Sequence, residues 1–352
     1  MSMKNNYLKG RGAQNRVSNR FLNNYIAYDE SVQYEQAESG IQTQYFKEHP
    51  RKIVNTVNSP DIGFALSLNP YQGCEHGCVY CYARSSHEYW GFNSSIDFES
   101  KIIVKENAPE LLEQYFLKNK KDVQPIALSG NTDCYQPAER KYGITRKLLE
   151  MFVKYKSPVS IITKNSLILR DLDLLRELAK DNLVHVMISV TSQNEELRRI
   201  LEPRTSSAKN KFKAMKKLSE NGIPVGVMTA PIIPGLNHHE IPQLLREAAN
   251  CGAGRAAYTV VRLNGSIDEI FREWLKKNYP DRFDKVIHQI ESLHGGKVND
   301  SEFGRRMKGE GPYASIIKQL FNTAYRKYFD LNDKNINLNT KAFRRGGNYQ
   351  LF

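Results

Sequence analysis

The sequence predicts an α/β fold, an incomplete TIM-like (β/α)6 barrel. Between residues 60 and 267, six short apolar runs alternate with helix-like segments, which is typical of parallel strands joined by crossover helices. Six such units over about 200 residues are two short of a closed barrel. No G-x-G-x-x-G motif follows the first run. Its absence argues against the alternative, a doubly wound dinucleotide-binding sheet.

The predicted strands are rich in β-branched and aliphatic residues, and most end at polar residues or at a Pro-Gly pair. They cover residues 63–68, 125–129, 159–163, 184–190, 224–233 and 256–263. Amphipathic periodicity predicts the intervening helices at 108–117, 144–155, 172–180, 209–221 and 240–250. In a parallel barrel the polar strand ends meet at one face, where the chemistry is located.

Two extensions flank the barrel (60–267), one at 1–59 and one at 268–352. The first five basic residues of the N-terminal extension precede any acidic residue; they are Lys4, Lys9, Arg11, Arg16 and Arg20. This start is either an arm that lies on phosphates or a solvated terminus. Residues 42–56 are more regular and are expected to pack on the core. The C-terminal extension contains predicted helices at 268–278, 282–293 and 313–328, a glycine-broken basic stretch at 303–313 and a loose tail from residue 335.

Composition narrows the class of protein. No run of 18 apolar residues occurs and the N-terminus has no apolar signal core, so we expect no membrane span and a cytoplasmic protein. Five cysteines, three of them clustered, are too few for a secreted disulfide framework. The formal charge of +13 favours a polyanionic partner such as nucleic acid, although a solvated Lys-rich surface explains the same charge.

The clustered cysteines form a C-x3-C-x2-C motif after the first predicted strand, at Cys74, Cys78 and Cys81. Structural zinc sites use four ligands, whereas a [4Fe–4S] cluster held by three cysteines leaves one iron free for another ligand. No second C-x2-C pair and no His pair at zinc-finger spacing occur in the chain. The motif therefore favours an iron–sulfur cluster at the catalytic face.

With the aromatic Tyr80 before its third cysteine, the motif resembles the signature of the radical S-adenosylmethionine (SAM) superfamily. The resemblance implies that Cys74, Cys78 and Cys81 ligate the cluster and that its open iron binds the methionine part of SAM. It also implies that an electron donor such as flavodoxin or ferredoxin reduces the cluster, which then cleaves SAM to a 5′-deoxyadenosyl radical. Iron–sulfur clusters reach the low potential that this needs.

Within the superfamily, the sequence is similar to the spore photoproduct lyase-like (DNA repair photolyase-like) group, and most similar to an uncharacterised branch of it. The similar stretches are Ser129–Asp133, Thr163-Lys164, Ile188–Thr191, Glu202–Arg204 and Ala230–Asn237. The resemblance implies cofactor contacts for Tyr80, Thr132, Asp133, Lys164, Ser189 and Arg204.

Simpler roles are open for several of these side chains. Lys164 can be a surface lysine, Asp133 can cap a turn, and Arg204 can pair with Glu202 or another acid. Tyr80 can simply pack beside the cluster.

Cys134 departs from the pattern of the lyase-like group, in which a cysteine in this region returns a hydrogen atom to the product radical. There the cysteine lies just before a Ser-Asp pair; here Asn131 takes that place and Cys134 follows Asp133. The resemblance suggests Cys134 as a hydrogen donor, and the alternative is a packing role, since small buried cysteines are common.

The sequence thus predicts a radical SAM enzyme that abstracts hydrogen from a substrate, with nucleic acid as the expected class. The alternatives are modification of RNA, a peptide or a protein side chain, an iron–sulfur redox sensor without turnover, and a zinc-stabilised nucleic-acid-binding module. The final residues, Gln350, Leu351 and Phe352, faintly resemble the peptide with which bacterial repair proteins dock on the sliding clamp.

Overall fold

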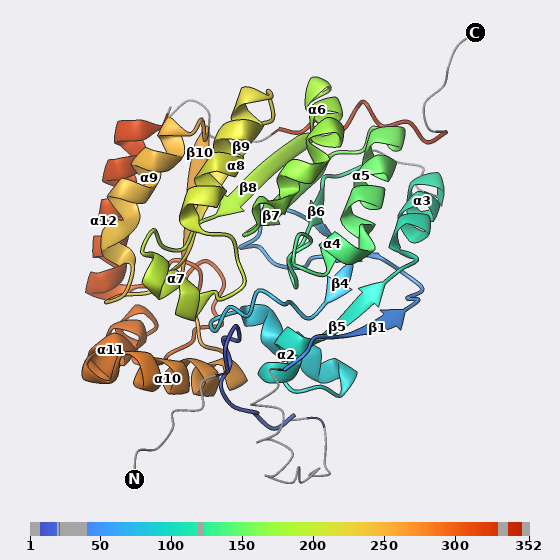
Figure 1. Cartoon of the computed structure of the whole chain (residues 1–352). Coiled ribbons are helices and arrows are strands. Elements are labelled where there is room, and N and C mark those ends of the chain that lie inside the picture. Colours follow the sequence, from blue (N-terminus) through green and yellow to red (C-terminus); the bar gives the residue numbers. More distant parts are fainter. Residues whose placement is uncertain (1–7, 20, 22–40, 119–122, 330–336, 347–352) are drawn as a thin grey trace.

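Six parallel strands form the main sheet of the computed structural model, which describes residues 8–19, 21, 41–118, 123–329 and 337–346 (Figure 1). In sheet order they are β3 (Leu66–Leu68), β6 (Ile126–Leu128), β7 (Val159–Thr163), β8 (Val184–Ser189), β9 (Val225–Ile232) and β10 (Arg255–Val260). A short seventh strand, β2 (Val54–Thr56), pairs antiparallel with β3 at one edge. Because the parallel strands follow one another in chain order, the predicted six-unit barrel is confirmed.

The helices between these strands cover one face of the sheet (Figure 1). They are α3 (Ala108–Lys118), α4 (Glu139–Tyr142), α5 (Ile144–Tyr155), α6 (Leu172–Lys180), α7 (Glu195–Leu201), α8 (Ala208–Glu220) and α9 (Ile241–Asn250), with 3-10 turns η2 (Ser166–Asp171) and η3 (His238–Glu240). The main apolar core lies between them and the sheet. The two 3-10 turns and the short α4 and α7 were not predicted, and each of the other helices was predicted to within one residue at either end.

A second, three-stranded sheet was not predicted. It consists of β1 (Gln44–Glu48), β5 (Lys101–Lys105) and β4 (Tyr71–Gln72), in the order β1-β5-β4. The elements η1 (Tyr82–Trp90) and α2 (Ile96–Ser100) lie between β4 and β5 in the chain. The expectation that residues 42–56 pack on the core is confirmed, because Ile53 and Val54 lie in the main apolar core and Tyr45 packs against it.

The C-terminal extension contains α10 (Ser266–Asn278), η4 (Pro280–Arg282), α11 (Phe283–Leu293) and α12 (Gly311–Tyr328). α12 lies beside α9 (Figure 1), whereas α10 and α11 form a second core with the cysteine loop. Residues 298–308 run beside the free edge of β10, where the Val260 N–H donates to the Met307 oxygen at 3.0 Å. Lys308 Nζ donates to the Tyr258 oxygen at 2.8 Å on the same edge.

The prediction of a loose tail is wrong for residues 337–346, which cross the end of the barrel opposite the cysteine loop (Figure 1). Leu338 is buried, Phe343 packs on Phe116, and the Asn339 N–H donates to the Asn182 oxygen at 2.9 Å. The suggested sliding-clamp residues Gln350, Leu351 and Phe352 lie outside the described residues.

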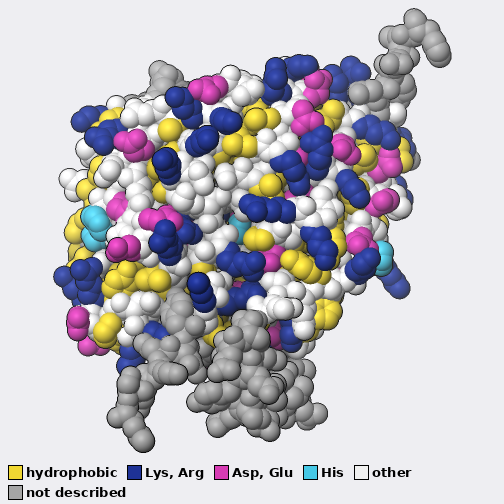
Figure 2. All heavy atoms as spheres, viewed as in Figure 1, with side chains coloured by type: hydrophobic (Ala, Val, Ile, Leu, Met, Phe, Trp, Pro, Cys, Tyr) yellow, Lys and Arg dark blue, Asp and Glu magenta, His cyan; other side chains and the backbone are white. Residues whose placement is uncertain are grey.

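Charge is spread widely over the face of the molecule that Figure 2 shows. On the face in Figure 2, Lys and Arg side chains are scattered between acidic and apolar ones rather than gathered in one patch. Arg11, which was considered as a phosphate contact, is buried and donates to the Ile41 oxygen at 2.7 Å. In the part of the chain that the structure describes, we find no helix with the length and apolar content of a membrane span.

His185 on β8 gives the fold a measurable pH dependence. It is buried, and burial, with Arg255 adding to it, lowers its pKa to about 3. The unfolded chain binds a proton below about pH 6.5, so the free energy of unfolding should fall as the pH drops from there. Between about pH 6.5 and pH 4.5, wild type should lose about 2 kcal/mol more than His185→Leu in urea unfolding. An equal loss in both proteins contradicts this, and His288→Leu, at an exposed site on α11, is the control.

Candidate active site at the strand ends

The cysteine loop (residues 73–81) is a series of tight turns. Cys74 and Cys78 are buried and Cys81 is half-buried. The Cys81 N–H donates to the Cys78 oxygen at 3.3 Å, and Gly73 and Gly77 supply the left-handed backbone that the turns need, with φ of 78° and 68°. Cys81 packs against two apolar clusters, one containing Cys74 and the other Cys78. The three thiols therefore share one neighbourhood.

Two of the three thiols lose their protons less readily than a free cysteine does. Burial raises the pKa of the Cys78 thiol, and Glu202 adds to the rise. Burial also raises the pKa of Cys81 to about 11, and Cys74 adds to this. Among the described residues, no three His, Cys, Asp or Glu side chains are arranged to hold a single metal ion. A [4Fe–4S] cluster needs a wider arrangement, because each thiolate binds a different iron, and bound iron deprotonates the thiols.

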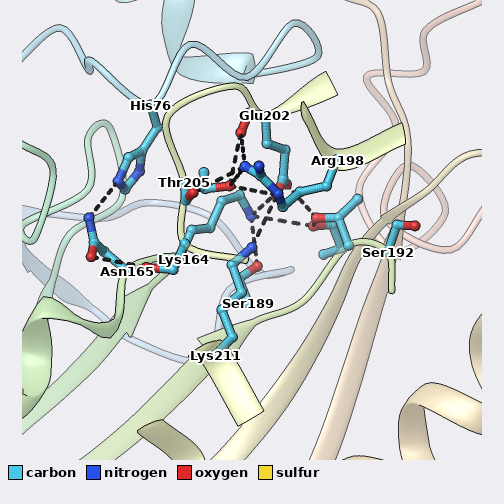
Figure 3. A network of polar contacts seen from close by, with 12 residues as sticks. His76, Lys164, Asn165, Ser189, Ser192, Arg198, Glu202, Thr205 and Lys211 are labelled. Atoms are coloured by element: carbon cyan, nitrogen blue, oxygen red, sulfur yellow. Dashed lines mark hydrogen bonds and ion pairs between the residues drawn. The ribbon is translucent and has the colours of Figure 1, made fainter. Parts of the chain in front are cut away.

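Lys164, directly after β7, lies at the centre of a polar network (Figure 3). Its Nζ donates to Ser189 Oγ, at the end of β8, at 2.7 Å and lies 3.7 Å from Glu202 Oε1. It also lies 5.9 Å from the centre of the Tyr80 ring. The structure thus brings together three residues that the sequence placed in the cofactor site: Tyr80, Lys164 and Ser189.

Glu202 is the buried carboxylate of this network. Its Oε1 accepts hydrogen bonds from the Tyr80 hydroxyl and, at 2.5 Å, from Thr191 Oγ1. Its Oε2 lies 3.1 Å from Nζ of Lys211, which is also buried. Burial alone would raise the pKa of Glu202, but Lys211 and Lys164 outweigh it and hold the pKa well below its usual range. Two ammonium groups share this one carboxylate. Among these three side chains, positive charge therefore exceeds negative charge by one, which favours the approach of another anion.

Asp133 and Thr132 hold the cysteine loop against the strand ends. Asp133 Oδ1 accepts from Thr163 Oγ1 at 2.7 Å, and Oδ2 accepts from the Lys164 N–H at 2.8 Å. Thr132 Oγ1 donates to the Gly73 oxygen at 2.7 Å. Both side chains are thus engaged within the protein and support the loop on which the cysteines lie.

His76, between two of the cysteines, was missed by the sequence reasoning. It is buried, its Nδ1 lies 3.3 Å from Asp133 Oδ2, and its Nε2 lies 3.2 Å from Asn165 Nδ2 (Figure 3). Burial favours the neutral ring, but Asp133 and Cys74 outweigh it and raise the pKa of His76 to about 10. Its place inside the cysteine motif was the available signal. Lys211 was also missed, since nothing distinguishes it from the other lysines of α8.

The side chains of Arg204 and Cys134 have partners other than Lys164. Arg204 Nη1 lies 3.2 Å from Oε1 of Glu75, which belongs to the cysteine loop. It therefore pairs with an acid, as the simpler interpretation held, but with Glu75 instead of Glu202. Cys134 is fully buried in the main core, and its N–H donates to Ser129 Oγ at 3.0 Å. This placement favours packing, and the hydrogen-donor role stays a prediction.

Comparison with known proteins gives a consistent picture. The family model described as the radical SAM superfamily matches residues 68–248, just over half of the chain. An uncharacterised protein of Mycobacterium tuberculosis (strain H37Rv) is 32% identical over 234 residues, which are 66% of this chain and 69% of that protein. An uncharacterised protein of Methanocaldococcus jannaschii is 29% identical over 246 residues, 70% of this chain and 88% of its own.

Two further relatives have descriptive names. The radical SAM Nα-GlyT isomerase of Pseudomonas phage M6 is 24% identical over 271 residues, 76% of this chain and 52% of the phage protein. A spore photoproduct lyase mutant, solved with bound AdoMet and dinucleoside spore photoproduct, has a TM-score of 0.60 and 15% identity. That alignment covers 89% of this chain and 86% of the lyase, and it shows that the two share a fold.

The Glu202 network predicts a large loss of stability when its carboxylate is neutralised. Glu202→Gln leaves Lys211 buried without a counter-charge, so the metal-free protein should lose about 3–5 kcal/mol in urea unfolding. Adding Lys211→Met should restore part of the loss. Glu220→Gln, whose side chain is 58% exposed, is the matched control and should change stability by less than about 0.5 kcal/mol. A Glu202→Gln protein as stable as wild type would contradict the assignment.

Proposed function

The chain belongs to the radical SAM superfamily, and we propose from this that it is an enzyme that abstracts a hydrogen atom from a nucleic acid substrate. The cofactors of the family, a [4Fe–4S] cluster and SAM, supply the 5′-deoxyadenosyl radical for such chemistry. The observation that carries the proposal is the pair of Lys164 and Ser189 at adjacent strand ends, 2.7 Å apart and next to the cysteine loop. A redox sensor has no need of that pair.

Cys74, Cys78 and Cys81 are the proposed ligands of the cluster. All three lie on one short loop, in largely apolar surroundings that limit the access of water. The electron donor, for which a flavodoxin or ferredoxin is proposed, would reach the cluster from outside the barrel.

Lys164 and Ser189 are proposed to bind the carboxylate of SAM. The network holds one more ammonium group than carboxylates, and the methionine part of SAM carries the anion that is lacking. A charge-assisted hydrogen bond in a buried site orients its ligand strongly. Tyr80, beside Lys164, is proposed to line the same site. Thr132 and Asp133 are proposed to act through the loop and the Lys164 backbone, which they hold in place.

Nucleic acid is the proposed substrate class because two exposed aromatic rings and two arginine side chains lie near one another, in a row that begins beside the cysteine loop. This aromatic–arginine row consists of Tyr82, Arg262, Arg306 and Phe303. Tyr82, next to Cys81, and Phe303 are each more than half exposed. The guanidinium carbon of Arg306 lies 4.4 Å from the centre of the Phe303 ring. Exposed rings beside cations form stacking platforms for bases.

Arg262 connects the row to the mouth of the barrel, since it follows β10. Its charge acts on Tyr82, and burial, with Arg306 adding to it, lowers the pKa of Arg262. Among the described residues, its guanidinium reaches the Asp300 oxygen at 3.5 Å, a weak contact. Arg262 is thus placed to bind a phosphate near the cysteine loop.

The names of two similar proteins are the basis for the reaction types that we propose. The structural neighbour is a lyase that holds a dinucleoside photoproduct, and the phage relative is named as an isomerase. We therefore propose cleavage or rearrangement of a nucleotide, in that order. Modification of a peptide or protein side chain is the alternative that the row of aromatic and arginine side chains disfavours.

Cleavage of SAM tests the enzyme proposal directly. After anaerobic reconstitution and reduction, wild type should form 5′-deoxyadenosine, detected by liquid chromatography, and Lys164→Met should bind SAM about 10- to 100-fold more weakly. Lys180→Met, at an exposed site on α6, should bind SAM like wild type. Bound iron without SAM cleavage would instead favour a sensor, and bound zinc without iron would favour a zinc module.

Binding of a single-stranded oligonucleotide tests the substrate class. Phe303→Ala and Arg262→Met should each weaken binding by about 5- to 50-fold, because stacking or a phosphate contact is lost. Ile316→Ala, 47% exposed on α12, removes a comparable apolar side chain elsewhere and should have no effect. Fluorescence anisotropy at fixed salt measures all four proteins. Equal affinity in wild type and both row variants would contradict nucleic acid binding at this surface.

A further inference from the structure

We propose that residues 8–17, which we call the N-terminal wall, close the outer side of the cysteine loop and slow the loss of iron from the cluster. The proposal rests on the proposed function only in taking Cys74, Cys78 and Cys81 as the cluster ligands. The sequence suggested an arm or a solvated terminus for this segment. The structure instead packs it against the loop.

The contact between wall and loop is made by two glycines. A Cβ added to Gly12 would lie 1.8 Å from the Gly77 oxygen and 2.9 Å from Val79 Cγ1. Gly77 lies between Cys74 and Cys78 in the sequence, so the wall reaches the loop between two ligands. The backbones touch directly, which leaves no room for water between them at this point.

A buried carboxylate fastens the wall to the backbone of a ligand. Glu99 is fully buried, and its two oxygens accept from the N–H groups of Gly12 at 2.9 Å and Ala13 at 2.8 Å. Arg84 Nη2 donates to Glu99 Oε1 at 2.5 Å and to the Cys78 oxygen at 2.8 Å. The buried Glu99–Arg84 ion pair thus holds both segments. Glu99 accepts hydrogen bonds from the wall, and Arg84 donates to the Cys78 oxygen.

Arg11 forms a second connection, toward Cys74. It is buried and donates to the backbone carbonyl oxygen of Glu99 at 2.5 Å and to Thr43 Oγ1 at 3.2 Å. Thr43 in turn donates at 3.0 Å to Glu75 Oε1, and Glu75 adjoins Cys74. Arg11 is therefore tied up within the protein, where it joins the wall to the residues behind the first ligand.

The wall completes an enclosure that the barrel provides only on one side. Asp133 and Thr132 hold the inner side of the loop against the strand ends. On the outer side, the wall is a stretch without a regular helix or strand, apart from turns and bends. Such a segment opens locally far more easily than the barrel unfolds, so its few contacts set how often small molecules reach the cluster from outside.

Iron release from the reconstituted full-length protein tests the proposal. An iron chelator is added under anaerobic conditions, and release is followed by the colour of the iron complex and by the loss of cluster absorbance. Gly12→Ala should release iron at least about fivefold faster than wild type, because its methyl group forces the wall away from Gly77. Gly63→Ala is the matched control, since no atom lies within 4 Å of its added Cβ.

Arg11→Met removes the anchor without placing an atom against the loop, and it should also release iron faster. Thermal unfolding of the metal-free proteins should agree within a few degrees, which separates opening of the wall from global destabilisation. Iron release at the wild-type rate in both Gly12→Ala and Arg11→Met would overturn the proposal. A wild-type protein that holds iron but does not cleave SAM would contradict the proposed function and leave this comparison valid.

Discussion

The candidate site depends on the charge balance around one buried carboxylate. Glu202 draws together the Tyr80 hydroxyl of the cysteine loop, Lys211 of α8 and Lys164 at the end of β7. Burying two ammonium groups is costly unless an anion lies beside them, so these elements have to meet at Glu202. The same arrangement leaves two ammonium groups beside one carboxylate, and this is the basis for proposing that Lys164 contacts the carboxylate of SAM. The packing of these elements and the proposed contact with SAM thus have a common electrostatic origin.

The cysteine loop itself has little regular structure and is held in place from several directions. His76, Asp133 and Thr132 fix it to the strand ends, and Arg84 fixes the Cys78 carbonyl from behind. A loop that is to hold a cluster in a defined position needs such support, because the ligands alone do not orient it. Most of these supports are polar groups that are buried and paired.

The sequence allowed prediction of those features that are encoded locally. Apolar runs bounded by polar residues or a Pro-Gly pair predicted the six strands, and the C-x3-C-x2-C spacing singled out the cysteine loop, since both patterns lie within a few neighbouring residues. Leu338 and Phe343, which pack the tail onto the barrel, are isolated apolar residues without periodicity and gave no such signal. The pairing of Glu202 with Lys211 depends on the turn between α7 and α8, and the pairing of Gly12 with Gly77 joins distant segments. Only the folded chain shows these contacts.

The covered edge of β10 has a consequence for solubility during synthesis and storage. A partial barrel has two sheet edges, and exposed edges can add strands from other molecules. Here the Met307 oxygen accepts a hydrogen bond from β10, and Lys308 donates one to a β10 carbonyl. The opposite edge of the sheet is β2, a strand of only three residues. Short or covered edges offer a poor template for intermolecular pairing. The barrel can therefore stay open for a substrate without inviting aggregation through its unclosed side.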